Sequence, residues 1–173
     1  MWGARSNQVV LSMILRHRDS GEEICVATTH LKAKLGDLQS SFRYEQSKDI
    51  LCWLEAIRGE RPVIMGGDFN GLPCEGFYKT LTENSTTPLV SAYKVKEDRR
   101  HESNQEDCID YTTWKIRDTG EQKHILDYIF HSPELETVST LAMPSEQQIG
   151  PGRLPSLQFA SDHLSLVADI RLV

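Results

Sequence analysis

A short apolar run that ends in two glycines, an acid and an amide constrains this fold most strongly. Residues 62–73 read PVIMGGDFNGLP. A buried strand needs neither the carboxylate of Asp68 nor the amide of Asn70, and glycine weakens a strand unless a ligand or another backbone approaches closely. The run therefore predicts a core strand that ends either in a functional site or in a polar turn.

The rest of the chain alternates between short β-rich runs and two helical segments. Apolar residues recur every three or four positions across residues 40–58, which predicts an amphipathic helix. A shorter helix is expected near residues 75–83, and a polar loop at residues 96–110. Strands are expected at residues 8–16, 24–31, 62–66, 111–116, 125–131, 136–142 and 163–173. This pattern predicts an α+β layered domain whose strands pair mostly in the antiparallel sense.

Length, composition and charge limit the classes of protein to which the chain can belong. Its 173 residues favour one domain, and no linker divides them. Hydrophobic residues make up 39% and charged residues 25%, as in ordinary soluble globular proteins. The formal net charge of -6 argues against broad, charge-driven binding of nucleic acid. It is compatible with a phosphate pocket, which needs a few local cations and not a basic surface.

Cysteine usage and the length of the apolar runs bear on location. The four cysteines show no zinc-binding spacing, which favours reduced thiols in an intracellular protein; they are Cys25, Cys52, Cys74 and Cys108. The apolar runs are too short to span a bilayer, and the first residues lack the apolar stretch of a signal peptide. We therefore expect a monomer without membrane insertion, located in the cytoplasm, or in mitochondria if a transit peptide lies upstream.

Asp68 and Asn70 form the first candidate site. If the strand continues through both residues, alternation points their side chains to the same face. A carboxylate beside an amide carbonyl suits a hard cation or a water molecule that awaits activation. The alternative is an Asx turn, in which the Asp68 side chain caps the end of the strand.

A second candidate site lies at the end of the run ICVATTHLKAK. His30 ends this run and shares a face with Lys32, and Lys34 adds another cation nearby. Lysine ammonium groups beside an imidazole are what a bound phosphate requires. A lone histidine at the end of a strand is more often structural, so this segment alone does not decide between the two interpretations.

Two further segments place ionisable residues next to apolar strands. Asp127 interrupts the run ILDYIFH, and burying an unpaired carboxylate is costly, so it should have a histidine or a metal ion as partner. Asp162 and His163 stand together before the last strand, although both residue types are also common in turns. The convergence of such groups from distant strand ends would suit metal-assisted hydrolysis of a phosphate ester.

Four segments, in this order along the chain, resemble the exonuclease–endonuclease–phosphatase superfamily: TTHLK, GGDFN, LDYIF and SDHLSLV. The resemblance covers nearly the whole chain. It implies a deoxyribonuclease I-like four-layer α/β/β/α sandwich, of which residues 1–173 are the C-terminal portion of a single domain without its N-terminal half. THLKAK and YTTWKIR resemble segments of members that remove the 2′-phosphate of NADP and NADPH.

The resemblance also implies a role for each candidate residue. Asp68 is the expected general base, and Asn70 contacts the phosphate and the metal-bound water. His30 and His163 bind the scissile phosphate, Asp127 orients His163 or lies near the metal ion, and Asp162 supports the same cluster. The cofactor is expected to be Mg²⁺, and the expected ligands from this chain are Asp68, Asn70 and Asp162.

Substrate recognition is expected from a few cations and one aromatic ring. By the same resemblance, Lys32, Lys34 and Arg117 match positively charged residues that bind a dinucleotide in members of the family. Trp114 could stack on a base, but an aromatic residue in a β-rich run is more often part of the core. The leading hypothesis is thus an NADP(H) 2′-phosphatase. The alternatives are a 3′-to-5′ poly(A) exonuclease that acts on an RNA 3′ end, and a catalytically silent binding domain.

The chain departs from the family pattern in one respect that matters for catalysis. The family's metal-binding glutamate follows an early strand, and these residues contain no match for it, so we expect it upstream. Without it, the affinity for Mg²⁺ should fall, and catalysis by these residues alone should be weak or absent. We also expect unpaired strand edges and exposed apolar faces, which favour aggregation.

Overall fold

The apolar runs of the chain assemble into a five-stranded sheet with the strand order β1–β2–β3–β9–β4. The computed structural model describes residues 8–84, 86–95 and 108–173. The five strands are β1 (Val10–Arg16), β2 (Glu23–His30), β3 (Val63–Asp68), β4 (Val90–Ser91) and β9 (Asp127–His131). The pairing of β2 with β3 is parallel, and the other pairs of this sheet are antiparallel. A parallel pair needs a crossover connection, which helix α1 (Asp37–Arg58) supplies.

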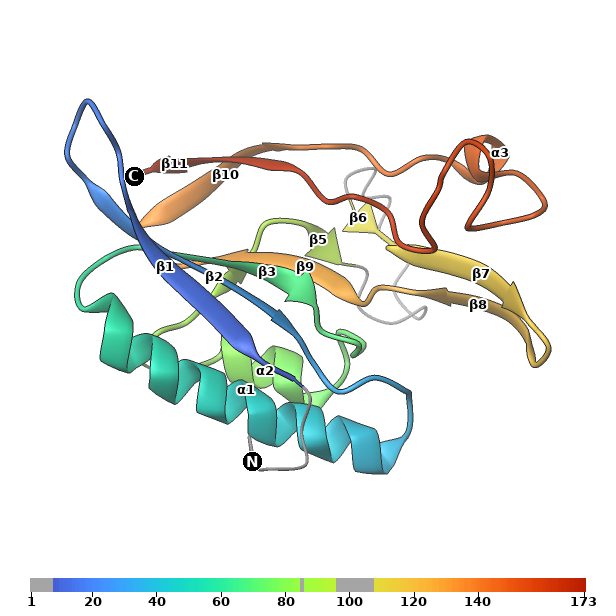
Figure 1. Cartoon of the computed structure of the whole chain (residues 1–173), viewed down its shortest axis with the longest axis horizontal. Coiled ribbons are helices and arrows are strands. Elements are labelled where there is room, and N and C mark those ends of the chain that lie inside the picture. Colours follow the sequence, from blue (N-terminus) through green and yellow to red (C-terminus); the bar gives the residue numbers. More distant parts are fainter. Residues whose placement is uncertain (1–7, 85, 96–107) are drawn as a thin grey trace.

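Helices α1 and α2 (Gly76–Thr82) cover one face of the sheet (Figure 1). Alternate residues of the strands point toward them, so Cys25 and Ala27 of β2 are buried, as are Val63 and Met65 of β3. The helices bury apolar residues at helical spacing against this face. They are Ile50, Leu51 and Leu54 of α1, and Phe77 and Leu81 of α2.

A second layer lies on the opposite side of the sheet from α1 (Figure 1). It contains the antiparallel pair β10 (Leu135–Thr140) and β11 (Ala168–Leu172). His131 links it to the sheet, because its Nε2 lies 3.0 Å from Thr137 Oγ1. The hairpin of β7 (Thr113–Arg117) and β8 (Gly120–His124) continues beyond the sheet. A smaller core joins this hairpin to the short helix α3 (Glu146–Ile149); its buried residues are Tyr111, Trp114, Ile149, Leu154 and Leu164.

The predicted α+β class with mostly antiparallel strands is confirmed, whereas three details of the prediction were wrong. The predicted strand 125–131 begins at Asp127, and the polar residues Gly120–His124 form β8 before it. The last strand is shorter than expected and runs from Ala168 to Leu172. Cys108–Ile109 form β6, which pairs with β5 (Lys94–Val95), while residues 96–107 of the predicted loop lie outside the described residues.

Within the described residues, no helix combines the length and the apolar character that crossing a bilayer requires.

Candidate active site

Three ionisable side chains stand in a row across neighbouring strands. His30 ends β2, Asp68 ends β3, and Asp127 begins β9. The register pairs His30 with Asp68 and Asp68 with Asp127, and side chains paired in this way project to the same face of a sheet. The parallel strands β2 and β3 end at the same edge, where the antiparallel β9 begins. The row therefore follows from the topology of the sheet.

His163 completes this group, which we call the sheet-edge cluster: His30, Asp68, Asp127 and His163. A β-bridge pairs His163 with Thr113 of the β7–β8 hairpin, and the histidine Nδ1 lies 2.8 Å from Asp127 Oδ2. This hydrogen bond raises the pKa of His163 above its usual value, and the imidazolium form is favoured. The Thr112 hydroxyl donates to the same carboxylate oxygen of Asp127 at 2.6 Å and so fixes its position.

The electrostatics of Asp68 fit a cation at this edge of the sheet. Burial raises the pKa of the Asp68 carboxyl, and the nearby charge of Asp127 raises it further. Ligand atoms of Asp68, Asp127 and His163 all lie within 4.8 Å of one another. A bound divalent cation would relieve the repulsion between the two carboxylates, and carboxylate oxygens are the ligands that hard cations prefer. The two carboxylates of the cluster therefore fit a divalent metal ion.

The Asp68–Asn70 turn differs from the predicted continuous strand. Strand β3 ends at Asp68, and Asn70 has a φ of 51°, so strand alternation does not place its side chain. Instead, the Asn70 backbone N–H donates to Asp68 Oδ1 at 2.8 Å, as in the Asx turn of the alternative interpretation. The Asn70 side-chain amide donates to Leu31 O at 3.2 Å. Among the residues that the structure describes, none donates to the amide oxygen, which can therefore act as a metal ligand or an acceptor.

Asp162 lies against two cations of strand β7. Its Oδ2 accepts hydrogen bonds from Lys115 Nζ at 2.8 Å and from Arg117 Nη2 at 3.3 Å. The bond from Lys115 lowers the pKa of the Asp162 carboxyl. Residues Thr113, Lys115 and Arg117 share one face of β7, and Thr113 Oγ1 also donates to Asp162 O. A metal-ligand role for Asp162 would require its carboxylate to leave these cations, and that role remains a prediction.

Trp114 points to the other face of β7 and belongs to the smaller core. The ring is 5% exposed, and its Nε1 donates to Glu121. Lys123 Nζ lies 4.2 Å from the ring centroid and the Arg153 guanidinium 4.0 Å from it. Stacking of a base on Trp114 would require these cations to move. The arrangement thus agrees with the core interpretation.

The predicted cations of the second candidate site follow β2 in an irregular segment. His30 is exposed, and its Nε2 lies 3.4 Å from Asp68 Oδ2. Lys32 is half-buried, and Lys34 is exposed with a φ of 76°. Both lysines lie within four residues of His30, at the edge of the sheet that carries the cluster.

Thr112 and Lys115 were missed as candidate residues. The signal for Lys115 was present, because period-two alternation places it on the same face as Arg117. Thr112 offered no comparable signal, since a threonine in a β-rich run is ordinary. Thr112 acts by donating a hydrogen bond to Asp127, a contact that local sequence patterns do not predict.

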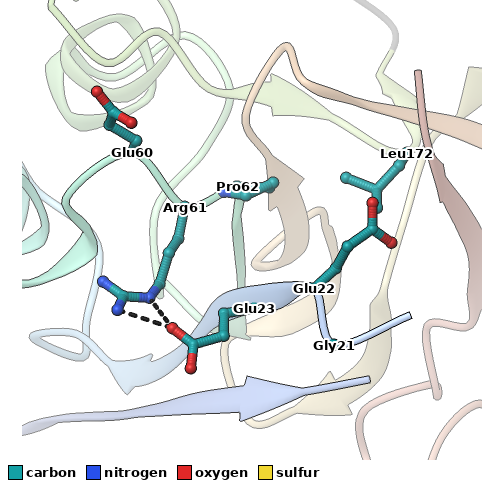
Figure 2. A pocket seen from close by; sticks show the side chains of 7 residues that line it. All are labelled: Gly21, Glu22, Glu23, Glu60, Arg61, Pro62 and Leu172. Carbon is teal, nitrogen blue, oxygen red and sulfur yellow. Dashed lines mark hydrogen bonds and ion pairs between the residues drawn. The ribbon is translucent and has the colours of Figure 1, made fainter. Parts of the chain in front are cut away.

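A hollow of about 530 Å³ lies at the other end of β2 and β3 (Figure 2). Figure 2 shows Arg61 paired with Glu23, whose Oε2 lies 2.8 Å from Arg61 Nε. The other charged lining residues are Glu22 and Glu60. A hollow with unneutralised carboxylates repels a phosphate, and we do not assign the candidate site to it.

Comparison with known proteins agrees with this arrangement of residues. A model of the Endonuclease/Exonuclease/phosphatase family matches residues 47–163, more than half of the chain, including Asp68, Asp127 and His163. This chain belongs to that family. Membership of the Endonuclease/Exonuclease/phosphatase family confirms the predicted superfamily and places the chain in a family of hydrolases. Enzymes of this family generally depend on a divalent metal ion, which agrees with the composition of the sheet-edge cluster.

Several family members are similar over nearly the whole chain. Nocturnin of Drosophila melanogaster is 41% identical over 187 residues, which cover 100% of this chain and 29% of that protein. Human 2′,5′-phosphodiesterase 12 is 28% identical and covers 96% of this chain and 29% of that protein. The structure of the human Nocturnin catalytic domain with bound sulfate matches with a TM-score of 0.73 and 37% identity. That match covers 97% of this chain and 54% of the solved domain, so the chain spans about half of it.

Proposed function

We propose that this chain acts in a Mg²⁺-dependent hydrolase that removes the 2′-phosphate of NADP(H). One observation carries the proposal: the sheet-edge cluster brings two carboxylates within 4.8 Å of a histidine whose pKa is raised, and the residue before that histidine binds two cations. The cations are Lys115 and Arg117, held by Asp162, the residue before His163. A cation site next to anion-binding groups suits the hydrolysis of a phosphate ester.

The residues divide into metal-binding and phosphate-binding groups. Asp68 and Asn70 would hold Mg²⁺, which when bound neutralises negative charge on the phosphoryl oxygens. The carboxylate of Asp68 would accept the proton of the attacking water. His163, held as an imidazolium by Asp127, would donate to a phosphoryl oxygen as negative charge develops there. His30 would bind the same phosphate from the end of β2.

Recognition by a few cations supports a compact substrate. Lys32, Lys34 and Arg117 would bind the phosphates of a dinucleotide, whereas the net charge of -6 disfavours a long RNA. The human Nocturnin catalytic domain, which matches this chain, carries a bound sulfate, an anion with oxygens arranged like those of a phosphate. The relative named 2′,5′-phosphodiesterase 12 also acts, by its name, on an ester at the 2′ position.

Release of inorganic phosphate from NADPH tests the proposal, measured on the protein extended upstream to include the metal-binding glutamate that we expect there. We expect release in the presence of Mg²⁺, its loss on chelation, and no shortening of a poly(A) oligonucleotide. Asp68→Ala should abolish turnover and leave NADP binding, measured by isothermal titration, largely intact. Asp19→Ala, which removes a carboxylate from the turn after β1, is the matched control and should retain full turnover.

Two other outcomes would contradict the proposal. Shortening of poly(A) without phosphate release from NADPH would support the exonuclease alternative. Binding of NADP without hydrolysis would support a binding module.

A further inference from the structure

Helix α1 buries a complete guanidinium group in its first half. Arg43 has 0% exposure, and every nitrogen of its side chain donates a hydrogen bond. Nε and Nη2 bind both carboxylate oxygens of Glu75 at 2.7–2.9 Å. Nη1 donates to two backbone carbonyls, Lys32 O at 2.9 Å and Lys34 O at 2.8 Å. A buried charge is costly unless it is paired and fully hydrogen-bonded, and Arg43 meets both conditions.

These contacts hold the irregular segment 31–36, which carries Lys32 and Lys34. Backbone groups that are not part of a helix or strand need other partners, and Arg43 supplies two of them. Gln46, one helical turn further along α1, accepts the Lys32 backbone N–H at 3.1 Å. The backbone on both sides of the Lys32 Cα atom and the carbonyl of Lys34 are therefore fixed by side chains of one helix.

The same pair also holds the segment that follows Asn70. Glu75 Oε1 accepts the Leu72 backbone N–H at 3.1 Å. Gly71 packs directly on the guanidinium, because a Cβ atom at this position would lie 2.9 Å from Arg43 Nε. One buried ion pair thus connects the segment with the two lysines to the turn that follows Asp68 and Asn70.

We infer that Arg43 is a positioning residue, which together with Glu75 fixes the backbone of residues 31–36 and thereby directs Lys32 and Lys34 to the substrate phosphate. The inference rests on the proposed function for the nature of the substrate. Lysine cannot replace Arg43 in this role, because a single ammonium group cannot reproduce the planar fork that reaches Glu75 and two carbonyls at once.

A double-mutant cycle between Arg43 and Lys32 tests the inference. We expect Arg43→Lys to raise the KM for NADPH about tenfold and to change kcat less than about threefold. The reason is that the lysines then bind the substrate more weakly in the ground state and the transition state alike. Lys32→Ala should raise KM in the wild-type background and much less in the Arg43→Lys background, since a lysine that is no longer directed contributes little. Arg58→Lys is the matched control: Arg58 lies in the last turn of α1 and pairs with Glu134, remote from both segments. In that background Lys32→Ala should retain its full effect.

Additive effects of Arg43→Lys and Lys32→Ala would overturn the inference, as would an equal loss from Arg58→Lys. Should Arg43→Lys fail to fold, Glu75→Gln removes the charge of the partner and enters the same cycle. All variants are made in the upstream-extended protein; if its wild type does not hydrolyse NADPH, the proposed function fails, and hydrogen exchange then decides the positioning role separately. Arg43→Lys should speed exchange of backbone amides at residues 32–36 more than Arg58→Lys does; equal exchange in the two variants would refute the role.

Discussion

Two adjacent glycines before Asp68 have different structural roles. A Cβ atom on Gly67 would lie 2.0 Å from Thr29 O, and its φ of +152° is one that other residues rarely adopt. A Cβ atom on Gly66 would meet Tyr128 O at 3.6 Å, an ordinary contact distance. Close approach of another backbone, expected from the sequence for both glycines, thus applies to Gly67 alone.

Substitution of the two glycines separates these roles. We expect Gly67→Ala to lower the free energy of unfolding by about 2–4 kcal/mol, because the backbone of β2 must move away. Gly66→Ala should change it by less than about 1 kcal/mol. Urea denaturation of both variants provides the measurement. Equal destabilisation would contradict the assignment of close backbone approach to Gly67 alone.

At the same scale, we expect the carboxylate of Asp127 to contribute to catalysis through its negative charge as well as through its hydrogen bonds. Asp127→Asn can still accept from Thr112 but no longer favours the imidazolium form of His163. We expect kcat for NADPH hydrolysis to fall about 100-fold or more, with a smaller change in KM. Asp110→Asn, which removes an exposed carboxylate paired with Lys123, is the control and should keep kcat. A kcat unchanged by Asp127→Asn would remove His163 from the proposed reaction.

At the scale of elements, helix α1 shows what the periodicity of apolar residues can predict and what it cannot. The spacing of apolar residues predicts the helix, and Ile50 and Leu54 are buried as that spacing requires. It does not predict burial of Arg43 and Gln46, because their partners belong to segments that follow other strands. Phe42, an apolar residue of the predicted stripe, is exposed instead. A pattern of apolar positions identifies the helix and misses the polar half of its buried face.

Strand β8 illustrates a second limit of local patterns. Residues 120–124 read GEQKH and carry no apolar alternation, so the sequence gives little sign of a strand. The strand forms because it pairs with β7, and Glu121 accepts hydrogen bonds from Trp114 Nε1 and Arg153 Nε. Arg153 lowers the pKa of the Glu121 carboxyl, and the bond from Trp114 lowers it further.

The depressed pKa of Glu121 predicts how stability depends on pH. A carboxyl whose pKa is lower in the folded state stabilises the fold above its ordinary value of 4.5 and loses this effect as the pH falls through the folded-state value. We expect Glu121→Gln to lower Tm at pH 7, with a difference from the wild type that shrinks below pH 4.5. Thermal unfolding followed by circular dichroism at several pH values measures it. A difference that persists undiminished at low pH would assign the effect to packing and not to the charge.

At the scale of the whole molecule, the candidate site could be predicted in its members but not in its geometry. The sequence indicates that His30, Asp68, Asp127 and His163 matter, because each ionisable group stands within or beside an apolar run. Their meeting depends on the parallel pairing of β2 with β3 and on the register with β9, which local patterns do not specify. For the same reason, the contact of Asp162 with Lys115 and Arg117 was not predicted.

The molecule also exposes a row of apolar side chains on β1, the outermost strand of the five-stranded sheet in the described part of the chain. Leu11, Met13 and Leu15 share one face and are 58%, 49% and 45% exposed. An apolar edge strand is a template for pairing with another chain, so we expect the protein to self-associate as its concentration rises. Light scattering against concentration measures this association.

Two lysine substitutions decide whether this row is responsible. Met13→Lys should reduce self-association, whereas Leu157→Lys should not, because Leu157 is fully exposed in a segment away from the sheet. Both variants change the formal net charge from -6 to -5, which weakens charge repulsion between copies and would by itself favour association. A decrease specific to Met13→Lys must therefore come from the lost apolar contact on β1. An equal decrease of self-association in both variants would show that association does not involve strand β1.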